Sequence, residues 1–226
     1  MVALILADGD APARAVLDAA WPGWDESVDL VIAADGGARH ASMLGVVIDV
    51  WVGDGDSIGE AALASLAAAG IPIERSRPDK DESDTELAMA AALRLGATGI
   101  VIVGALGGPR IDHALANLGL LAMPELAGRP VTVVDAGSRI TLLRAPGPDG
   151  RPVEHRLPGH VGGLVSLLPV GDGVEGVTTS GLAYPLVDEP LPFGRARGLS
   201  NVRAALDARV TVRRGSLLVV ESPATL

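Results

Sequence analysis

The sequence contains no cysteine, which excludes disulfides, thiolate metal ligands and cysteine nucleophiles. Aromatic residues make up only 2% of the 226 residues, so the core must be built from aliphatic side chains and alanine. No stretch approaches the roughly 18 apolar residues of a membrane-spanning helix. The net charge of −10 argues against a nucleic-acid partner, because such a partner requires a basic face. We therefore expect a cytoplasmic protein with no nucleic-acid or membrane partner.

Lysine is almost absent as well. Lys80 is the only lysine, and the other 17 basic residues are arginines. It lies in an acidic segment, Lys80-Asp81-Glu82-Ser83-Asp84. Since a compact ammonium contacts a phosphate differently from a planar guanidinium, the position is a candidate phosphate contact. Chance retention of one lysine is an equally good explanation.

The first half of the chain alternates short apolar runs with stretches of helix-forming residues. This alternation predicts a mainly parallel sheet with helices on both faces. The run at 2–7 meets Asp8 at once and has no basic flank, which favours a first strand over a signal peptide. The predicted strands are 2–7, 30–34, 49–52, 71–74, 99–103 and 131–134, and the predicted helices are 11–20, 36–44, 59–69, 84–95 and 112–123.

The second half has a different character. After a turn-rich segment at 146–150, short β-favouring runs are separated by glycine and proline, at 164–168, 174–178, 209–212 and 217–220. No long helix is predicted there, so a small all-β sandwich or barrel is expected. We predict an α/β domain over residues 1–144 and a β-sandwich domain over residues 145–226.

Acidic turns follow several of the predicted strands. Examples are Asp35-Gly36-Gly37 and Gly53-Asp54-Gly55-Asp56-Ser57. In an open α/β sheet these turns meet at the carboxyl ends of the strands, where ligands bind. Gathered carboxylates repel one another unless a cation joins them, and Mg²⁺ prefers oxygen ligands and often contacts substrate phosphates. The pattern predicts a metal-dependent enzyme that acts on a phosphate compound.

Asp54 and Asp56 are the strongest candidate metal ligands, and Asp81 is the third. For Asp84 a second explanation stays open, because an acidic residue at the start of a helix can simply cap it. A glycine-rich loop ending in Arg110 is typical of a phosphate contact. Asp112 and His113 follow it at a predicted helix start. The sequence has no P-loop spacing and no dinucleotide-binding fingerprint after the first strand.

Taken together, these motifs resemble the thiamine pyrophosphokinase (thiamine diphosphokinase) family. The resemblance spans nearly the whole chain and rests on motifs in sequence order. They are Ala34-Asp35-Gly36-Gly37-Ala38, Gly53-Asp54-Gly55-Asp56-Ser57, Lys80-Asp81-Glu82-Ser83-Asp84-Thr85-Glu86, Gly107-Gly108-Pro109-Arg110-Ile111-Asp112-His113-Ala114-Leu115-Ala116-Asn117, Gly181-Leu182-Ala183-Tyr184-Pro185-Leu186 and Leu199-Ser200-Asn201.

The resemblance implies a kinase that transfers a pyrophosphoryl group from ATP to the hydroxyl of thiamine, giving thiamine diphosphate and AMP. It also implies an α/β catalytic domain, a C-terminal β-sandwich and a homodimer with sites between subunits. Its implied roles are Mg²⁺ binding for Asp54, Asp56 and Asp81; catalysis for these three with Asp84, Arg110 and Asp112; ATP binding for Asp35, Gly36, Gly37, Lys80 and Arg110; and thiamine binding for Tyr184, Ser200 and Asn201.

The chain departs from the family pattern at two positions. Gly55 stands where the family usually has phenylalanine, and Pro109 lengthens the glycine-rich loop by one residue. Two alternatives stay open. One is a pyrophosphokinase for another hydroxymethyl heterocycle such as a pterin, and the other is a non-catalytic sensor that binds thiamine or a nucleotide. The acceptor of the hydroxyl proton also stays open, with Asp81 and Asp112 as candidates.

Overall fold

The computed structural model describes residues 1–224, which divide into two compact units. The first contains residues 1–123 and 129–136, and the second contains residues 124–128 and 137–224. The strand Arg139–Ala145 (β7) belongs to the second unit, so this unit begins a few residues before the predicted domain start at 145. The assignment of roles to residues 1–144 and 145–226 stays a prediction.

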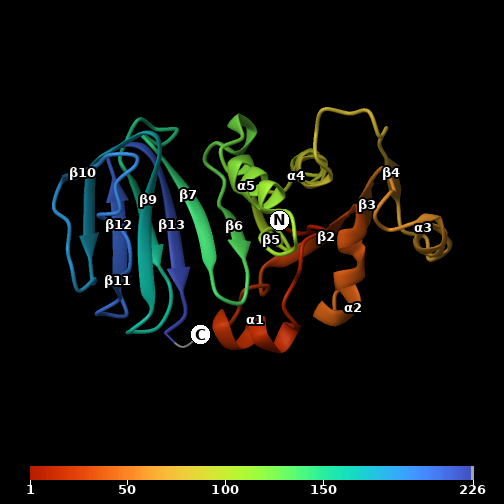
Figure 1. Ribbon diagram of the computed structural model, residues 1–226, viewed down its shortest axis with the longest axis horizontal. Helices are drawn as coiled ribbons and strands as arrows, with labels where there is room; N and C mark the ends of the chain where they lie inside the picture. Colours follow the sequence, from red (N-terminus) through yellow and green to blue (C-terminus); the bar gives the residue numbers. More distant parts are fainter. Residues whose placement is uncertain (225–226) are drawn as a thin grey trace. The chain divides into compact units, whose positions relative to one another are not determined.

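The first unit is built on a six-stranded parallel sheet (Figure 1). Its strand order is β4-β3-β2-β1-β5-β6, and every neighbouring pair is parallel. The predicted parallel α/β sheet is therefore confirmed. The strands are β1 Val2–Leu6, β2 Val28–Ala34, β3 Val50–Gly53, β4 Ile73–Arg75, β5 Gly99–Val103 and β6 Val131–Val134.

Helices connect these strands and cover the sheet. Alternate residues such as Leu4 and Leu6 pack with Leu17 and Leu44 of two helices in one core cluster. Another helix, α4, packs against β1, β2 and β3. The helices are α1 Arg14–Ala20, α2 His40–Leu44, α3 Glu60–Ala68, α4 Asp84–Arg94 and α5 Ile111–Leu120, with a 3-10 helix η1 Asp35–Arg39 before α2.

The second unit is an antiparallel β region, as predicted. Its strand order is β7-β13-β9-β12-β8, and two short strands, β10 and β11, also pair with β9. Besides these strands, its described residues contain only a short 3-10 helix, η2 Pro124–Leu126. The strands after β7 are β8 Val153–Leu157, β9 Leu164–Ser180, β10 Glu189–Leu191, β11 Asn201–Val202, β12 Ala208–Val212 and β13 Arg214–Ser222.

The long strand β9 replaces two strands that the sequence predicted separately, at 164–168 and 174–178. The glycines between those runs suggested a turn, but Gly171 and Gly173 adopt positive φ within a continuous, irregular strand. The first part of β9 pairs with β13, and its last part pairs with β12. This strand therefore joins both groups of strands around one buried aliphatic core.

Charged side chains are also buried in the second unit. Glu221 of β13 pairs with Arg203 at 2.7 Å and with Arg139 at 2.9 Å. Arg203 also donates hydrogen bonds to the carbonyls of Leu157 and Pro158. Because each charge is paired and hydrogen-bonded, the group is enclosed without an unsatisfied ion.

Among the described residues, no helix is both long enough and apolar enough to cross a membrane.

Candidate active site at the carboxyl ends of the parallel strands

Asp35 lies at the end of β2, where the chain turns into η1. Its side chain is only 1% exposed, and its φ is +43°, which is uncommon for a residue other than glycine. The backbone N–H groups of Ser57 and Ile58 donate to its carboxylate at 3.1 and 3.2 Å. The indole N–H of Trp51 donates to the Asp35 carbonyl at 3.0 Å. These contacts fix the carboxylate beside the turn that follows β3.

Asp54 lies directly after β3. A Cβ on the preceding Gly53 would come within 2.9 Å of Cβ of Asp35, so glycine is what lets these two turns approach each other. Oδ1 of Asp54 accepts the N–H of Asp56 at 3.1 Å. This backbone contact, together with the nearby ammonium of Lys80, lowers the pKa of Asp54, so its carboxylate is ionised at neutral pH.

Asp84 is the first residue of α4, but it does not cap the helix. The cap is Ser83, whose hydroxyl accepts the N–H of Glu86 at 3.2 Å. The Asp84 side chain is thus available for other contacts, and its buried Oδ1 forms an ion pair with the Lys80 ammonium at 2.9 Å. Burial raises the pKa of Asp84, although the ion pair with Lys80 opposes this change.

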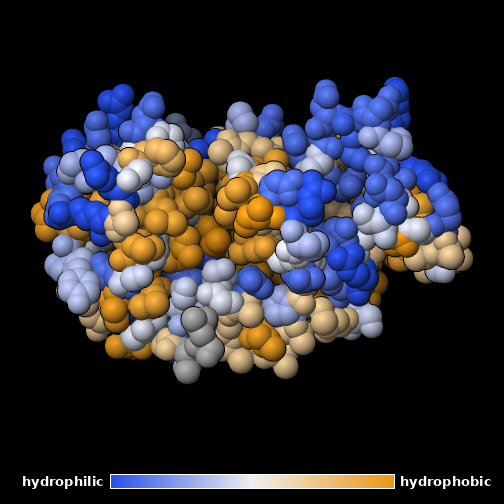
Figure 2. Space-filling view, in the orientation of Figure 1, coloured by the Kyte–Doolittle hydropathy of each residue, from blue (hydrophilic) through white to orange (hydrophobic). Residues whose placement is uncertain are grey.

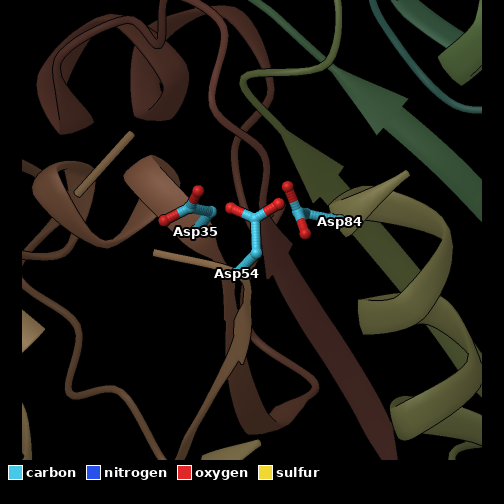
Figure 3. Close-up of side chains that lie close together, drawn as sticks. All are labelled: Asp35, Asp54 and Asp84. Atoms are coloured by element: carbon cyan, nitrogen blue, oxygen red, sulfur yellow. The ribbon is translucent and has the colours of Figure 1, made fainter. Parts of the chain in front are cut away.

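The carboxylates of Asp35, Asp54 and Asp84 come together at this edge of the sheet. One oxygen from each lies within 4.8 Å of the others. In Figure 3 the Asp54 carboxylate lies between the other two. Three carboxylates that can each offer a hard oxygen ligand at this spacing fit a divalent cation such as Mg²⁺. This part of the site can therefore bind a metal.

Lys80 contacts the same group of carboxylates. Its Nζ lies 3.1 Å from Oδ2 of Asp54 and 2.9 Å from Oδ1 of Asp84, and its side chain is 12% exposed. Burial alone lowers the pKa of Lys80, but the two carboxylates outweigh it and the pKa is raised. The lysine is therefore charged and is held between two of the three aspartates.

The protonation of Asp35 is also unusual. Burial raises its pKa to about 6, and the adjacent Asp56 side chain and the charge of Asp84 act in the same direction. The two backbone N–H groups that it accepts oppose this shift. A cation beside Asp35 favours its ionised form, so a metal and a proton are alternatives at this carboxylate.

The turn after β1 packs against this region and contains residues that we did not single out in the sequence. Arg39 of η1 pairs with the Asp8 carboxylate and also donates to its carbonyl. A Cβ on Gly36 would meet the Asp8 carboxylate, and one on Gly37 would meet the Leu6 carbonyl. Gly36 and Gly37 therefore allow η1 to lie directly on the end of β1.

Arg110 and Asp112 form an exposed ion pair at the start of α5. Nε and an Nη of Arg110 both donate to the Asp112 carboxylate, and the pairing lowers the pKa of Asp112 to about 2. So strongly ionised a carboxylate is a weak acceptor for a substrate proton. Nearby, the buried Asn117 donates to the Ala105 carbonyl at 2.9 Å and anchors the loop before α5.

In the second unit, Tyr184 lies beside Asn201. Oδ1 of Asn201 accepts the N–H of Tyr184 at 3.0 Å, and its Nδ2 donates to the Tyr184 carbonyl at 2.6 Å. Asn201 is buried and uses its amide on the backbone, whereas the Tyr184 side chain is 69% exposed. Ser200 precedes Asn201 with a φ of +57°, and its N–H donates to Ser166. Asn201 thus holds the backbone of a residue whose aromatic ring is exposed.

The structure gathers some of the predicted site residues and leaves others apart. Of the three predicted metal ligands, only Asp54 belongs to the group of carboxylates close enough to share an ion. Asp56 is next to this group through its contact with Asp35, and Asp81 is exposed in the loop before α4. The roles of Asp56 and Asp81 as ligands stay predictions.

Comparison with known proteins matches both halves of the chain. Residues 23–133 match the model of the thiamin pyrophosphokinase catalytic domain. Residues 154–217 match that of the thiamin pyrophosphokinase vitamin B1 binding domain. The chain belongs to the thiamin pyrophosphokinase family. The resemblance stated from the motifs is confirmed, and so is the predicted enzyme class.

Individual family members agree with this result. The thiamine pyrophosphokinase of Bacillus subtilis (strain 168) is 24% identical over 200 residues, which cover 88% of this chain and 90% of that protein. A crystal structure of thiamine pyrophosphokinase from Bacillus subtilis matches with a TM-score of 0.80, 23% identity and 99% coverage of both chains. One from Geobacillus thermodenitrificans matches with a TM-score of 0.78, 24% identity and coverage of 100% and 99%. These structures establish that the thiamin pyrophosphokinase fold extends over the whole chain.

Proposed function

We propose that this protein transfers a pyrophosphoryl group from ATP to the hydroxyl of thiamine, with Mg²⁺ as the metal, and releases AMP. The observation that carries the proposal is the group formed by Asp35, Asp54 and Asp84 within a matched catalytic domain. When bound there, Mg²⁺ would neutralise charge on the phosphate oxygens. Asp56 and Asp81 remain candidates for further contacts with the metal or its water.

The residues of the chain would act mainly by positioning and by charge. Lys80 and Arg110 supply positive charge near the phosphates, and Gly36 and Gly37 let the backbone come close to the nucleotide. The thiamine hydroxyl must approach the β-phosphorus in line while a carboxylate takes its proton. Of the two candidate acceptors, Asp112 is poorly suited to that role because Arg110 lowers its pKa to about 2, so Asp81 is the remaining candidate.

The second unit would select the acceptor. Residues 154–217 match a vitamin B1 binding domain, and the exposed ring of Tyr184 offers a face for a cationic thiazolium. Asn201 would hold that ring in position, and Ser200 would contact thiamine from the same loop. We further propose that two copies of the chain form a homodimer with sites between subunits, and that the reaction takes place in the cytoplasm.

The test is to incubate the protein with ATP, Mg²⁺ and thiamine and to identify the products by mass. Thiamine-dependent release of AMP together with thiamine diphosphate is expected. ADP with thiamine monophosphate would contradict the two-phosphate transfer. A hydroxymethyl pterin that is turned over in place of thiamine would identify a different acceptor, and thiamine binding without turnover would indicate a sensor.

A further inference from the structure

The ammonium of Lys80 contacts two of the carboxylates that would also ligate a metal, so the two cations would compete for them. Its ammonium lies 3.1 Å from Oδ2 of Asp54 and 2.9 Å from Oδ1 of Asp84. A Mg²⁺ ion binds its oxygen ligands at about 2.0–2.1 Å. A metal on these oxygens would therefore stand only a few ångströms from the lysine nitrogen. At that separation, two positive charges in a partly buried site repel each other strongly.

A cavity beside Lys80 gives its side chain room to leave the carboxylates. Together with the residues around it, Lys80 lines a cavity of about 280 Å³ on the side of the loop between β4 and α4. The Ser76 hydroxyl in this cavity is buried and has no hydrogen-bond partner among the described residues. Figure 2 shows hydrophilic residues gathered over this loop. The residues that line the cavity are Ser76, Arg77, Asp79, Lys80, Glu82 and Leu87.

We propose that Lys80 and a divalent cation are alternative counter-ions for Asp54 and Asp84. In this scheme the lysine holds the two carboxylates together until metal and nucleotide enter, and it then turns from the carboxylates toward the phosphates. The proposal rests on the proposed function, because the phosphates of ATP give the displaced ammonium a new partner. It makes Lys80 a phosphate-binding residue that also couples metal binding to nucleotide binding.

Removing the positive charge of Lys80 tests the proposal without any turnover. Lys80→Met should bind Mn²⁺ more tightly than the wild type in the absence of nucleotide, by about tenfold or more, as measured by titration calorimetry on EDTA-treated protein. Lys80→Arg keeps the charge and should bind Mn²⁺ weakly. Arg94→Met is the matched control, because Arg94 is an exposed cation of the same unit whose partner is Glu74. Its Mn²⁺ affinity should stay close to that of the wild type.

Three results would overturn the proposal. Equal Mn²⁺ affinity in the wild type and Lys80→Met would mean that the ammonium and the metal do not compete. Equal tightening in Arg94→Met would mean that only net charge matters. Absence of Mn²⁺ binding in Lys80→Met would mean that the lysine is not what limits the metal. None of these results depends on thiamine, so failure of the proposed reaction would be seen separately in the product assay.

A measurement on the wild type covers the case in which Lys80→Met does not fold. Since Lys80 is the only lysine, protein labelled with ¹³C and ¹⁵N in lysine gives a single set of lysine side-chain NMR signals. Adding Mg²⁺ with a non-hydrolysable ATP analogue should move the Cε and Nζ signals of the wild type. The same addition to Asp54→Asn should leave them nearly unchanged. Unmoved signals in a wild type that demonstrably binds both ligands would overturn the proposal.

Discussion

In the first unit, three buried or partly buried carboxylates face one another across the ends of β2, β3 and α4, and one lysine is shared between two of them. In the second unit, the buried carboxylate of Glu221 is enclosed by Arg139 and Arg203, with two arginines for one acid. The first arrangement has an excess of negative charge, and the second does not. The excess of negative charge attracts a cationic ligand, whereas the second group, in which every charge has a partner, contributes to the fold.

The same contrast holds for the residues expected to meet substrates. Asp35 is held rigidly by backbone N–H groups and lies almost entirely out of solvent, whereas the ring of Tyr184 is exposed and only its backbone is held. Electrostatic stabilisation of a transition state requires fixed groups in a site from which most of the water is excluded. Recognition of a flat cation requires an accessible face. We infer that the first unit performs the transfer and that the second unit selects the acceptor.

Replacing the central carboxylate of the first unit should have the largest effect. Asp54→Asn removes a metal ligand and a partner of Lys80, so we expect kcat to fall roughly 10³-fold. The free energy of unfolding should change by only about 1 kcal/mol or less, because Lys80 keeps Asp84 as a partner and the loss of one carboxylate relieves repulsion within the group. Steady-state kinetics and urea denaturation of the same preparations measure the two quantities. Near-normal turnover would remove Asp54 from the metal site.

Replacing the carboxylate of the second unit should reverse this pattern. Glu221→Gln leaves two arginines beside a neutral residue, so the free energy of unfolding should fall by about 3–4 kcal/mol. The kcat of the molecules that remain folded should stay close to that of the wild type. Glu154→Gln is the control, because it breaks an exposed pair with Arg209 and should cost at most about 1 kcal/mol. If the two variants are equally stable, the buried network does not support the fold.

The raised pKa of Asp35 should make the free energy of unfolding depend on pH. Its pKa in the folded protein, about 6, lies above the unfolded value of 3.8. Between these two pH values the folded state therefore binds more protons than the unfolded state. The contribution of Asp35 to the free energy of unfolding is fully present below about pH 4 and is lost as the pH rises through 6. The loss should be at most about 3 kcal/mol. Urea denaturation in EDTA should show it in the wild type but not in Asp35→Asn; identical pH profiles would contradict the assignment.

Removing the exposed ring of Tyr184 in the second unit should have the smallest effect on the kinetics. Tyr184→Ala should raise the KM for thiamine by roughly 2- to 30-fold, the equivalent of a cation–π contact, with little change in the KM for ATP. Phe193→Ala is a matched control, because Phe193 is another exposed aromatic residue of the same unit. If both variants raise the KM for thiamine equally, Tyr184 does not contact the acceptor. The same conclusion follows if Tyr184→Ala raises the KM for ATP as much as the KM for thiamine.

Much of the first unit could be predicted from the sequence because its signals are local. Buried parallel strands read as continuous apolar runs, so the six strands were each located to within a few residues. The rule that acids follow strand ends also found Asp35 and Asp54. The same rule applied to the first strand would have identified Asp8, which η1 contacts through Arg39.

The geometry of the site could not be predicted in the same way. Spacing alone does not tell whether Ser83 or Asp84 caps α4, and that choice decides whether the Asp84 carboxylate is available. Likewise, the contact of Lys80 with Asp54 joins residues that are 26 positions apart and lie in different turns. In the second unit the strands β7, β8, β10 and β11 were missed. Each is short or carries polar residues among its apolar ones, so none forms a continuous apolar run.

The most direct test of the account is a crystal of the protein grown with Mn²⁺ and a non-hydrolysable ATP analogue, measured at a wavelength where manganese scatters anomalously. We predict an anomalous peak within bonding distance of carboxylate oxygens of Asp35, Asp54 and Asp84, with the ammonium of Lys80 turned to the phosphates. A peak bound only by Asp56 and Asp81, or no peak at this edge of the sheet although the analogue is bound, would contradict the account.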